Sequence, residues 1–152
     1  MTDLPILRKD ADTMKLLYSN ILPLGIGAEQ STITDCFNEQ ISDCDGVDIA
    51  VGYVSKAALE ELDTLIFKHS IGYVNLVMGM YYVDGMPEGT YRTAVALNEK
   101  WRDKGVGEIR MVRAFKYHGK LYVFHKNGDV KSAIIGSANL GVIKLEANNL
   151  RQ

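Results

Sequence analysis

The sequence predicts an α/β fold in which a mixed, largely parallel sheet is flanked by helices and ends in a C-terminal antiparallel hairpin. Strand-like segments alternate with segments of helical periodicity through most of the chain. Near the C-terminus, Asn127-Gly128 separates two strand-like segments, and this dipeptide favours a tight hairpin turn. The chain has 152 residues, of which 47% are apolar. That is enough for one domain with its own core.

The helices follow from apolar periodicity and from polar residues that cap helix starts. We expect helices at residues 10–22, 31–41 and 56–70, within residues 86–107, and at residues 138–150. Ser31 or Thr32 is the expected N-cap of the second helix, and Ser55 is that of the third. The fourth helix is expected to stop near Gly105, because glycine readily terminates helices.

The strands follow from runs of β-branched and aromatic residues. We expect them at residues 46–54, 73–83, 108–114, 118–126 and 129–137. The first three alternate with helices, which favours parallel pairing through helical crossovers. The last two flank the Asn-Gly turn and are expected to pair antiparallel.

Charge is distributed unevenly along the chain. Residues 1–99 contain 6 Lys and Arg against 15 Asp and Glu, whereas residues 100–152 contain 11 against 4. The basic part favours a phosphate-bearing ligand, although a solvated face paired with nearby acids explains the charge equally well. Neither a membrane span nor a signal peptide is indicated. Cys36 and Cys44 fit no metal-binding spacing, so we expect free thiols and a cytoplasmic protein.

The Asn-Gly turn predicts which residues of the hairpin face each other. If Asn127 and Gly128 form the loop, Lys126 faces Asp129, and every further pair follows by counting outward. This register gives the pairs Lys120–Ile135, Gly119–Gly136 and His118–Ser137.

A polar cluster is expected at the open end of this hairpin. His118 and Lys120 share a face because they are two residues apart on one strand. Ser137 would oppose His118, and Asn139 would continue on the same side. His125 lies an odd number of residues from His118, so it is expected on the other face.

The residue types of this cluster suit a reaction at a phosphodiester. An imidazole serves as nucleophile or proton carrier, a lysine meets the charge of the phosphate, and neutral donors complete the site. Metal-dependent nucleases need several convergent carboxylates, which this basic region lacks, so we expect neither a metal nor another cofactor. A histidine and a lysine without function on an exposed strand would give the same spacing.

The motif HGK at residues 118–120, followed by GSAN at residues 136–139, resembles the H-x-K…G-S-x-N signature of the phospholipase D superfamily. VDIAVGYVSKAALEEL (47–62) and GSANLG (136–141) are also similar to the catalytic domain of NgoFVII-type restriction endonucleases. The resemblance implies a phospholipase D-like sandwich. It also implies one catalytic domain over residues 1–152, expected to be a fragment that lacks a C-terminal DNA-recognition domain.

The resemblance implies a metal-independent endonuclease that cuts double-stranded DNA through a covalent phosphohistidine, as the catalytic module of a type II restriction enzyme. His118 resembles the superfamily's nucleophile, and Lys120 resembles its phosphate-binding lysine. Ser137 and Asn139 resemble the residues that hold the phosphate and orient the histidines.

Two positions depart from the superfamily pattern. His125 stands where the pattern has an aspartate, and Asp129 lies beyond the turn. Glu146 follows Asn139 by only seven residues, so we expect the superfamily's later glutamate to lie beyond Gln152.

The superfamily's reaction needs two histidines, whereas this chain has one motif. We therefore expect a homodimer in which two copies of His118 form one composite active site on the twofold axis. Two alternatives stay open. One is a phosphodiesterase that acts on phospholipid, and the other is a catalytically degenerate dimer module that binds nucleic acid.

Overall fold

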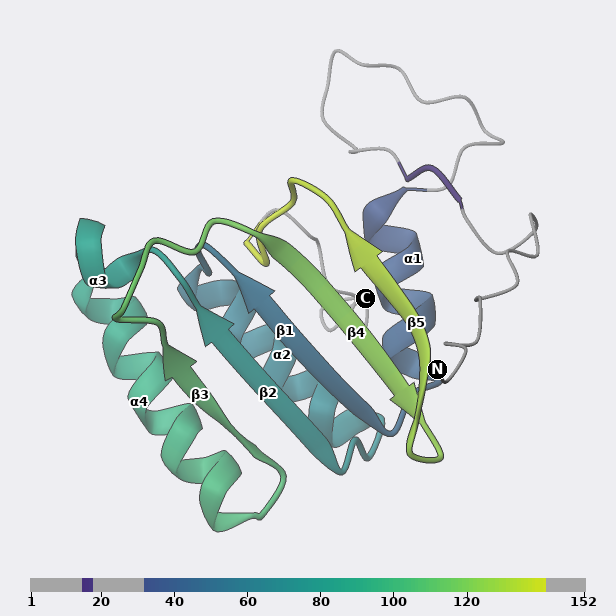
Figure 1. Ribbon diagram of the computed structural model, residues 1–152. Helices are drawn as coiled ribbons and strands as arrows, with labels where there is room; N and C mark the ends of the chain where they lie inside the picture. Colours follow the sequence, from purple (N-terminus) through teal and green to yellow (C-terminus); the bar gives the residue numbers. More distant parts are fainter. Residues whose placement is uncertain (1–14, 18–31, 142–152) are drawn as a thin grey trace, which may run out of the picture.

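The computed structural model describes residues 15–17 and 32–141. Figure 1 shows their helices and strands. In chain order the elements are α1 (Ile33–Ser42), β1 (Gly46–Val51), α2 (Lys56–Lys68), β2 (Tyr73–Met78), α3 (Tyr81–Asp84), α4 (Glu88–Asp103), β3 (Gly107–Met111), β4 (Lys120–Lys126) and β5 (Asp129–Ile135).

The described strands form one sheet in the order β3-β2-β1-β4-β5. β1 and β3 both pair parallel to β2, through the crossovers that contain α2 and α4. β4 pairs antiparallel to β1, and β5 pairs antiparallel to β4. The mixed α/β class and the C-terminal hairpin are therefore confirmed. The connection from β3 to β4 crosses the ends of β2 and β1, which puts the start of the hairpin beside the end of β1 (Figure 1).

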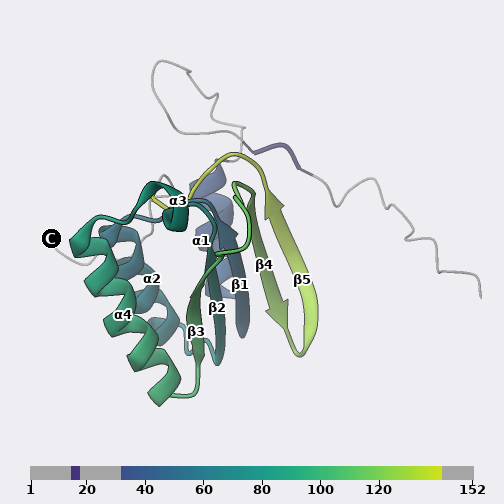
Figure 2. The same cartoon turned by 60° about the vertical axis from the view of Figure 1, so that its left-hand side comes forward.

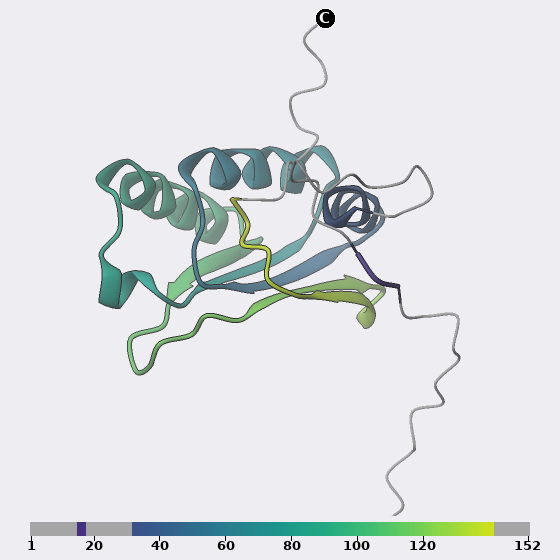
Figure 3. The same ribbon diagram turned by 90° about the horizontal axis from the view of Figure 1, so that it is seen from above.

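The helices α1, α2 and α4 lie against one face of the sheet (Figures 2 and 3). Alternate residues of β1 point into this layer: Val47, Ile49 and Val51 are buried, whereas Asp48 and Ala50 face the other side and are partly exposed. Within the described residues the other face carries no helix, so the second layer of the expected sandwich stays a prediction. The largest fully buried side chains are Trp101, Tyr122, Phe37, Phe124, Ile41, Ile49, Leu59, Leu62, Leu65, Ile66, Leu76 and Leu140.

The expected capping residues begin α1 and α2. The Thr32 hydroxyl accepts a hydrogen bond from the amide of Asp35 at 3.0 Å, and the Ser55 hydroxyl accepts one from the amide of Ala58 at 3.1 Å. The helix α4 ends just before Gly105, whose φ of 68° glycine adopts without steric cost. No helix in the described part of the chain has the length and apolar character needed to cross a membrane.

Some expected element boundaries are wrong. The strand predicted at residues 73–83 ends at Met78. The amide of Gly79 bonds to the carbonyl of Val51 and that of Met80 to the carbonyl of Gly52, and the chain then turns into α3. The strand predicted at residues 46–54 ends at Val51, where β4 begins to pair with it. The expected helix at residues 138–150 lies largely outside the described residues. The same holds for the one at residues 10–22, of which the described residues 15–17 are not helical.

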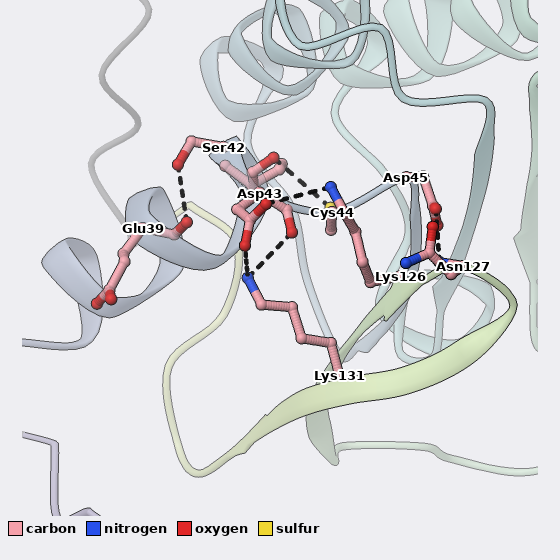
Figure 4. Close-up of polar contacts among 9 residues, drawn as sticks. Glu39, Ser42, Asp43, Cys44, Asp45, Lys126, Asn127 and Lys131 are labelled. Carbon is pink, nitrogen blue, oxygen red and sulfur yellow. Dashed lines mark hydrogen bonds and ion pairs between the residues drawn. The ribbon is translucent and has the colours of Figure 1, made fainter.

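The predicted hairpin turn is confirmed. Asn127 has a φ of 54° and Gly128 a φ of 85°, as a two-residue turn of this type requires. The turn is also held from outside the hairpin, by the segment between α1 and β1 (Figure 4). The Asp45 carboxylate accepts the Asn127 amide at 2.7 Å, and Asp43 pairs with lysines of both hairpin strands.

A β-bulge makes the predicted register wrong beyond the turn. His125 pairs with Val130, but Phe124 pairs with Ser132, so β5 contains one extra residue, Lys131. Nζ of Lys131 forms an ion pair with Oδ2 of Asp43 at 2.8 Å. Figure 4 shows this contact.

The bulge has a physical cause in the contacts of β5 with α1. The hydroxyl of Ser132 bonds the side chain of Gln40 in α1 at 2.6 Å, while its neighbour Lys131 reaches the end of the same helix. In a regular strand consecutive residues point to opposite faces. The bulge allows the consecutive residues Lys131 and Ser132 both to contact α1.

The pairs expected beyond the bulge are all displaced by one residue. Ile135 pairs with Leu121 instead of Lys120. The Gly136 amide bonds the Lys120 carbonyl at 3.2 Å, so Gly136 does not face Gly119. The ladder ends there: Ser137 lies in the bend after β5 and His118 lies before β4, so the two do not form a strand pair.

Candidate active site

The expected site residues lie where β1 and β2 end and β4 begins. Val51, the last residue of β1, pairs with Lys120, the first residue of β4. His118 precedes β4 in the connection from β3, while Asn139 follows β5. This is the edge at which the parallel strands of an α/β sheet present ligand-binding loops.

Gly52, directly after β1, is the point on which these side chains converge. A Cβ atom placed there would lie 2.8 Å from Cδ2 of His118 and 3.3 Å from Cγ of Met80. It would lie 3.5 Å from Oδ1 of Asn139. The imidazole and the amide therefore pack over bare backbone, and only glycine leaves them this room.

The His118 side chain is exposed, but its place is fixed. Its ring meets the ring of Tyr53 edge to face, with centroids 5.9 Å apart. The preceding residue, Tyr117, donates its amide to the Gly79 carbonyl at 3.2 Å. Neither ring nitrogen of His118 has a hydrogen-bond partner among the described residues, and the side chain is exposed.

Lys120 is hydrogen-bonded to the backbone of the histidine. It is only 7% exposed, and its Nζ donates to the main-chain carbonyl of His118 at 2.6 Å. An ammonium has three donors, so two remain for a bound anion. The lysine therefore does two things: it fixes the backbone at the histidine, and it brings a positive charge to the site.

Asn139 has a fixed orientation. Its Oδ1 accepts the main-chain amide of Tyr53 at 3.1 Å, which leaves its NH₂ group as the free donor. Its neighbours hold the segment in place: Leu140 is fully buried, and the carbonyl of Ala138 accepts the hydroxyl of Tyr122 at 2.7 Å. The amide is thus a preorganised donor beside the imidazole.

Ser137 is not brought against the histidine in the way the register predicted. It lies in the bend after β5, it is exposed, and its hydroxyl has no partner in the described part of the chain. The bulge at Lys131 accounts for this difference, because it moves every later residue of β5 by one position.

Tyr53 links the histidine to a carboxylate. Its hydroxyl donates to Asp84 in α3, and this hydrogen bond raises the pKa of the phenol. The sequence did not single out Tyr53, Met80 or Gly52. The one available signal was a glycine that directly follows a β-branched run. Glu146 lies outside the described residues.

The other two histidines are remote from this site. As predicted, His125 points to the opposite face of the sheet from Lys120, because the extra residue of the bulge lies in β5 and leaves the alternation of β4 intact. Nε2 of His125 lies 2.8 Å from the Asp48 carboxylate. His69 is the C-cap residue of α2, where its burial and the neighbouring Lys68 lower its pKa.

The described residues contain no group of three or more His, Cys, Asp and Glu placed to hold a metal ion. Cys36 and Cys44 are free thiols, and burial raises the pKa of both. The site therefore consists of an open imidazole, a buried ammonium and an oriented amide.

Comparison with known proteins points to one family. The family model of the NgoFVII restriction endonuclease N-terminal PLD domain matches residues 31–152, which include every element of the described fold. No curated protein matches the chain.

Proposed function

The chain belongs to the family of the NgoFVII restriction endonuclease N-terminal PLD (phospholipase D) domain, and from this premise we propose that it hydrolyses DNA phosphodiester bonds without a metal, through a covalent phosphohistidine at His118. It would serve as the catalytic module of a type II restriction enzyme. One observation carries the proposal: an exposed imidazole stands beside a buried lysine and an oriented amide.

In the first step a ring nitrogen of His118 attacks phosphorus. The N–P bond forms, the bond from phosphorus to the leaving oxygen breaks, and a second imidazole gives its proton to that oxygen. Lys120 and the NH₂ group of Asn139 are placed to meet the charge on the non-bridging oxygens. Ser137 is exposed nearby and would add a third donor after rotation of its side chain.

In the second step water attacks phosphorus and the N–P bond breaks. The second imidazole, now neutral, takes the proton of the water, while His118 leaves as neutral imidazole. Both histidines are then in their starting protonation states, so the cycle closes without a further reactant.

The second imidazole is expected to come from another copy of the chain. His125 is engaged with Asp48 on the far face of the sheet, and His69 lies at the end of α2. The histidine at the site is exposed, which leaves it free to approach its symmetry mate. We therefore propose a homodimer with one composite active site on its twofold axis.

The proposal is tested by incubating the protein with double-stranded plasmid DNA in excess EDTA. We expect cleavage that survives chelation, is abolished in His118→Ala, and is strongly reduced in Lys120→Met, which keeps most of the buried stem but lacks the charge. Cleavage that requires Mg²⁺ would refute the mechanism. DNA binding without cleavage in any variant would instead favour a degenerate binding module, and hydrolysis of phospholipid alone would favour the lipid enzyme.

A further inference from the structure

The connection between β3 and β4 presents an exposed segment that the mechanism above does not use. Its four residues, Arg113, Ala114, Phe115 and Lys116, are all exposed, and they are called the 113–116 loop here. Figure 3 shows the connection projecting from the sheet on the side opposite the helices.

Both ends of the 113–116 loop are anchored to the end of β2. The amide of Val112 bonds the carbonyl of Met78 at 2.9 Å, and the amide of Tyr117 bonds the carbonyl of Gly79 at 3.2 Å. The two segments are in close contact here, since a Cβ on Gly79 would lie 2.0 Å from the main-chain carbonyl oxygen of Tyr117. The loop is therefore exposed at its tip but fixed relative to the adjoining His118.

The 113–116 loop and the neighbouring α3 expose two aromatic rings and two cations, beside Val83 and Asp84 of α3. Phe115 is 64% exposed, and Tyr82 of the neighbouring α3 is 58% exposed. The guanidinium of Arg113 lies 5.7 Å from the centroid of the Tyr82 ring. Neither Arg113 nor Lys116 pairs with a carboxylate among the described residues, so both charges are available to a partner.

Aromatic rings between unpaired cations suit a nucleic-acid strand. Bases stack on exposed rings, and the cations meet the phosphates that connect the bases. A membrane surface would also attract cations and aromatics, but interfacial binding needs a broad apolar face. Three exposed side chains, Phe115, Tyr82 and Val83, provide too little apolar surface for that.

We propose, resting on the proposed function, that the 113–116 loop binds the DNA strand that is cut. Phe115 stacks on an unpaired base near the scissile phosphate, while Arg113 and Lys116 contact phosphates of the same strand. Three residues of chain reach at most about 10 Å. This is the greatest distance between the backbones of Phe115 and His118. At roughly 3.4 Å per nucleotide of one strand, it places the stacked base about one to three nucleotides from the phosphate at His118. The proposed enzyme cuts duplex DNA, so this contact requires the duplex to open locally at the cut site. The domain is therefore expected to bind single strands or locally opened duplex more tightly than intact duplex.

Binding separates this proposal from the chemistry. In a His118→Ala background, the Kd for a short labelled single-stranded oligonucleotide is measured by fluorescence anisotropy over a range of salt concentrations. We expect Phe115→Ala to weaken binding by about 5- to 150-fold, and Phe115→Tyr to restore it. Lys116→Ala is expected to reduce the slope of log Kd against log salt by about 0.7.

Two surface positions on α4 provide matched controls. Tyr91 is 55% exposed, and Arg92 is an exposed cation that pairs with Glu88. Tyr91→Ala and Arg92→Ala are expected to bind like the parent protein. Circular dichroism melting curves verify that all variants are folded.

Three outcomes would overturn the proposal. The first is that Phe115→Ala binds the oligonucleotide as tightly as Tyr91→Ala, and the second is that the parent protein binds single strands and duplex with equal affinity. The third is that the parent binds anionic phospholipid vesicles but not the oligonucleotide. The proposed function fails on a different result, the absence of cleavage by wild-type protein in EDTA. That result leaves the binding measurement intact, so the two failures are distinguishable.

Discussion

The absence of one side chain, at Gly52, determines where the imidazole of His118 lies. The histidine, Met80 and Asn139 all approach the space that a Cβ would fill. Such a position is difficult to find from sequence, because a glycine after a strand also marks an ordinary turn. The histidine itself was predictable from the spacing of its motif, whereas its neighbours Tyr53 and Met80 depend on the three-dimensional arrangement.

Gly52→Ala is expected to reduce activity much more than stability. The new methyl group displaces the imidazole, and a misplacement on the order of 1 Å costs about 100-fold in rate. The measurement compares the rate of DNA cleavage with the melting temperature. Gly72→Ala is the matched control, since a Cβ there would lie 3.9 Å from its nearest neighbour. Unchanged cleavage by Gly52→Ala would contradict this account of the site.

His125 has a structural role at the opposite end of the sheet. The Asp48 carboxylate accepts hydrogen bonds from Tyr73 at 2.6 Å and from Asn75 at 3.1 Å, in addition to its contact with His125. Partial burial acts to raise the pKa of Asp48, but these hydrogen bonds outweigh it and lower the pKa below its usual value of 3.8. The network therefore stabilises the ionised carboxylate.

The lowered pKa of Asp48 predicts an acid-sensitive contribution to stability. Because the folded state holds the proton more weakly than the unfolded state, the contribution is complete above about pH 4 and is lost as the pH falls through the lowered pKa. Asp48→Asn is expected to lower the free energy of unfolding by about 1 kcal/mol at pH 7, since the cluster is partly exposed. Urea titrations of both proteins from pH 7 to pH 3 measure the difference. A difference that grows toward low pH would refute the assignment.

At the scale of elements, local chemistry made the starts of α1 and α2 predictable, whereas α3 was predicted as part of a strand. Thr32 and Ser55 cap helices with their hydroxyl groups, as expected, and Asn127-Gly128 forms the expected turn. The strand after residue 73 ends early for a tertiary reason. Its last carbonyls and the amide of Gly79 bond to neighbouring segments, and sequence periodicity carries no information about those partners.

The bulge in β5 was not predictable from the turn that sets the register. Counting outward from the turn assumes that each residue of one strand has one partner, whereas Lys131 has none in the ladder. The polar contacts of Lys131 and Ser132 with α1 explain the extra residue, and α1 is about ninety positions away in the sequence. The predicted pairing of His118 with Ser137 was wrong because of this bulge and because both residues lie outside the paired strands.

Deletion of Lys131 is expected to preserve the fold. The deletion removes the bulge and one exposed ion pair, but the pairs on either side, including Leu121 with Ile135, keep their partners. The predicted loss in unfolding free energy is small, because the ion pair is exposed, and DNA cleavage is expected to continue. Lys131→Ala, which retains the bulge, isolates the ion pair. Cross-strand nuclear Overhauser effects between Leu121 and Ile135 provide the readout, and their loss in the deletion variant would contradict the assigned register.

At the scale of the whole molecule, the sheet brings together segments that are far apart in the sequence. The proposed reaction still needs a second histidine besides His118. The crossover from β3 to β4 places His118 beside Gly52, and the hairpin returns Asn139 to the same edge. The parallel units were predictable from the alternation of strands and helices. The antiparallel insertion of β4 beside β1 was not, because it depends on a connection without regular structure.

A composite site predicts how activity changes when wild-type and His118→Ala subunits are mixed and allowed to exchange. Random exchange of equal amounts leaves about one quarter of dimers with two histidines. The mixture is therefore expected to cleave DNA at about a quarter of the rate of pure wild-type protein at the same total concentration. A fall to one half would show that each protomer acts alone and would contradict the shared site.

The covalent intermediate provides the most direct test of the central claim. Wild-type protein is mixed with end-labelled DNA in excess EDTA, the reaction is stopped with alkali, which preserves a phosphorus–nitrogen bond, and protein-bound label is measured on a denaturing gel. The account predicts a transient protein–DNA adduct that mass spectrometry assigns to His118, that is released by acid, and that is absent from His118→Ala. Cleavage in EDTA with no adduct at any time, or an adduct on another residue, would contradict it.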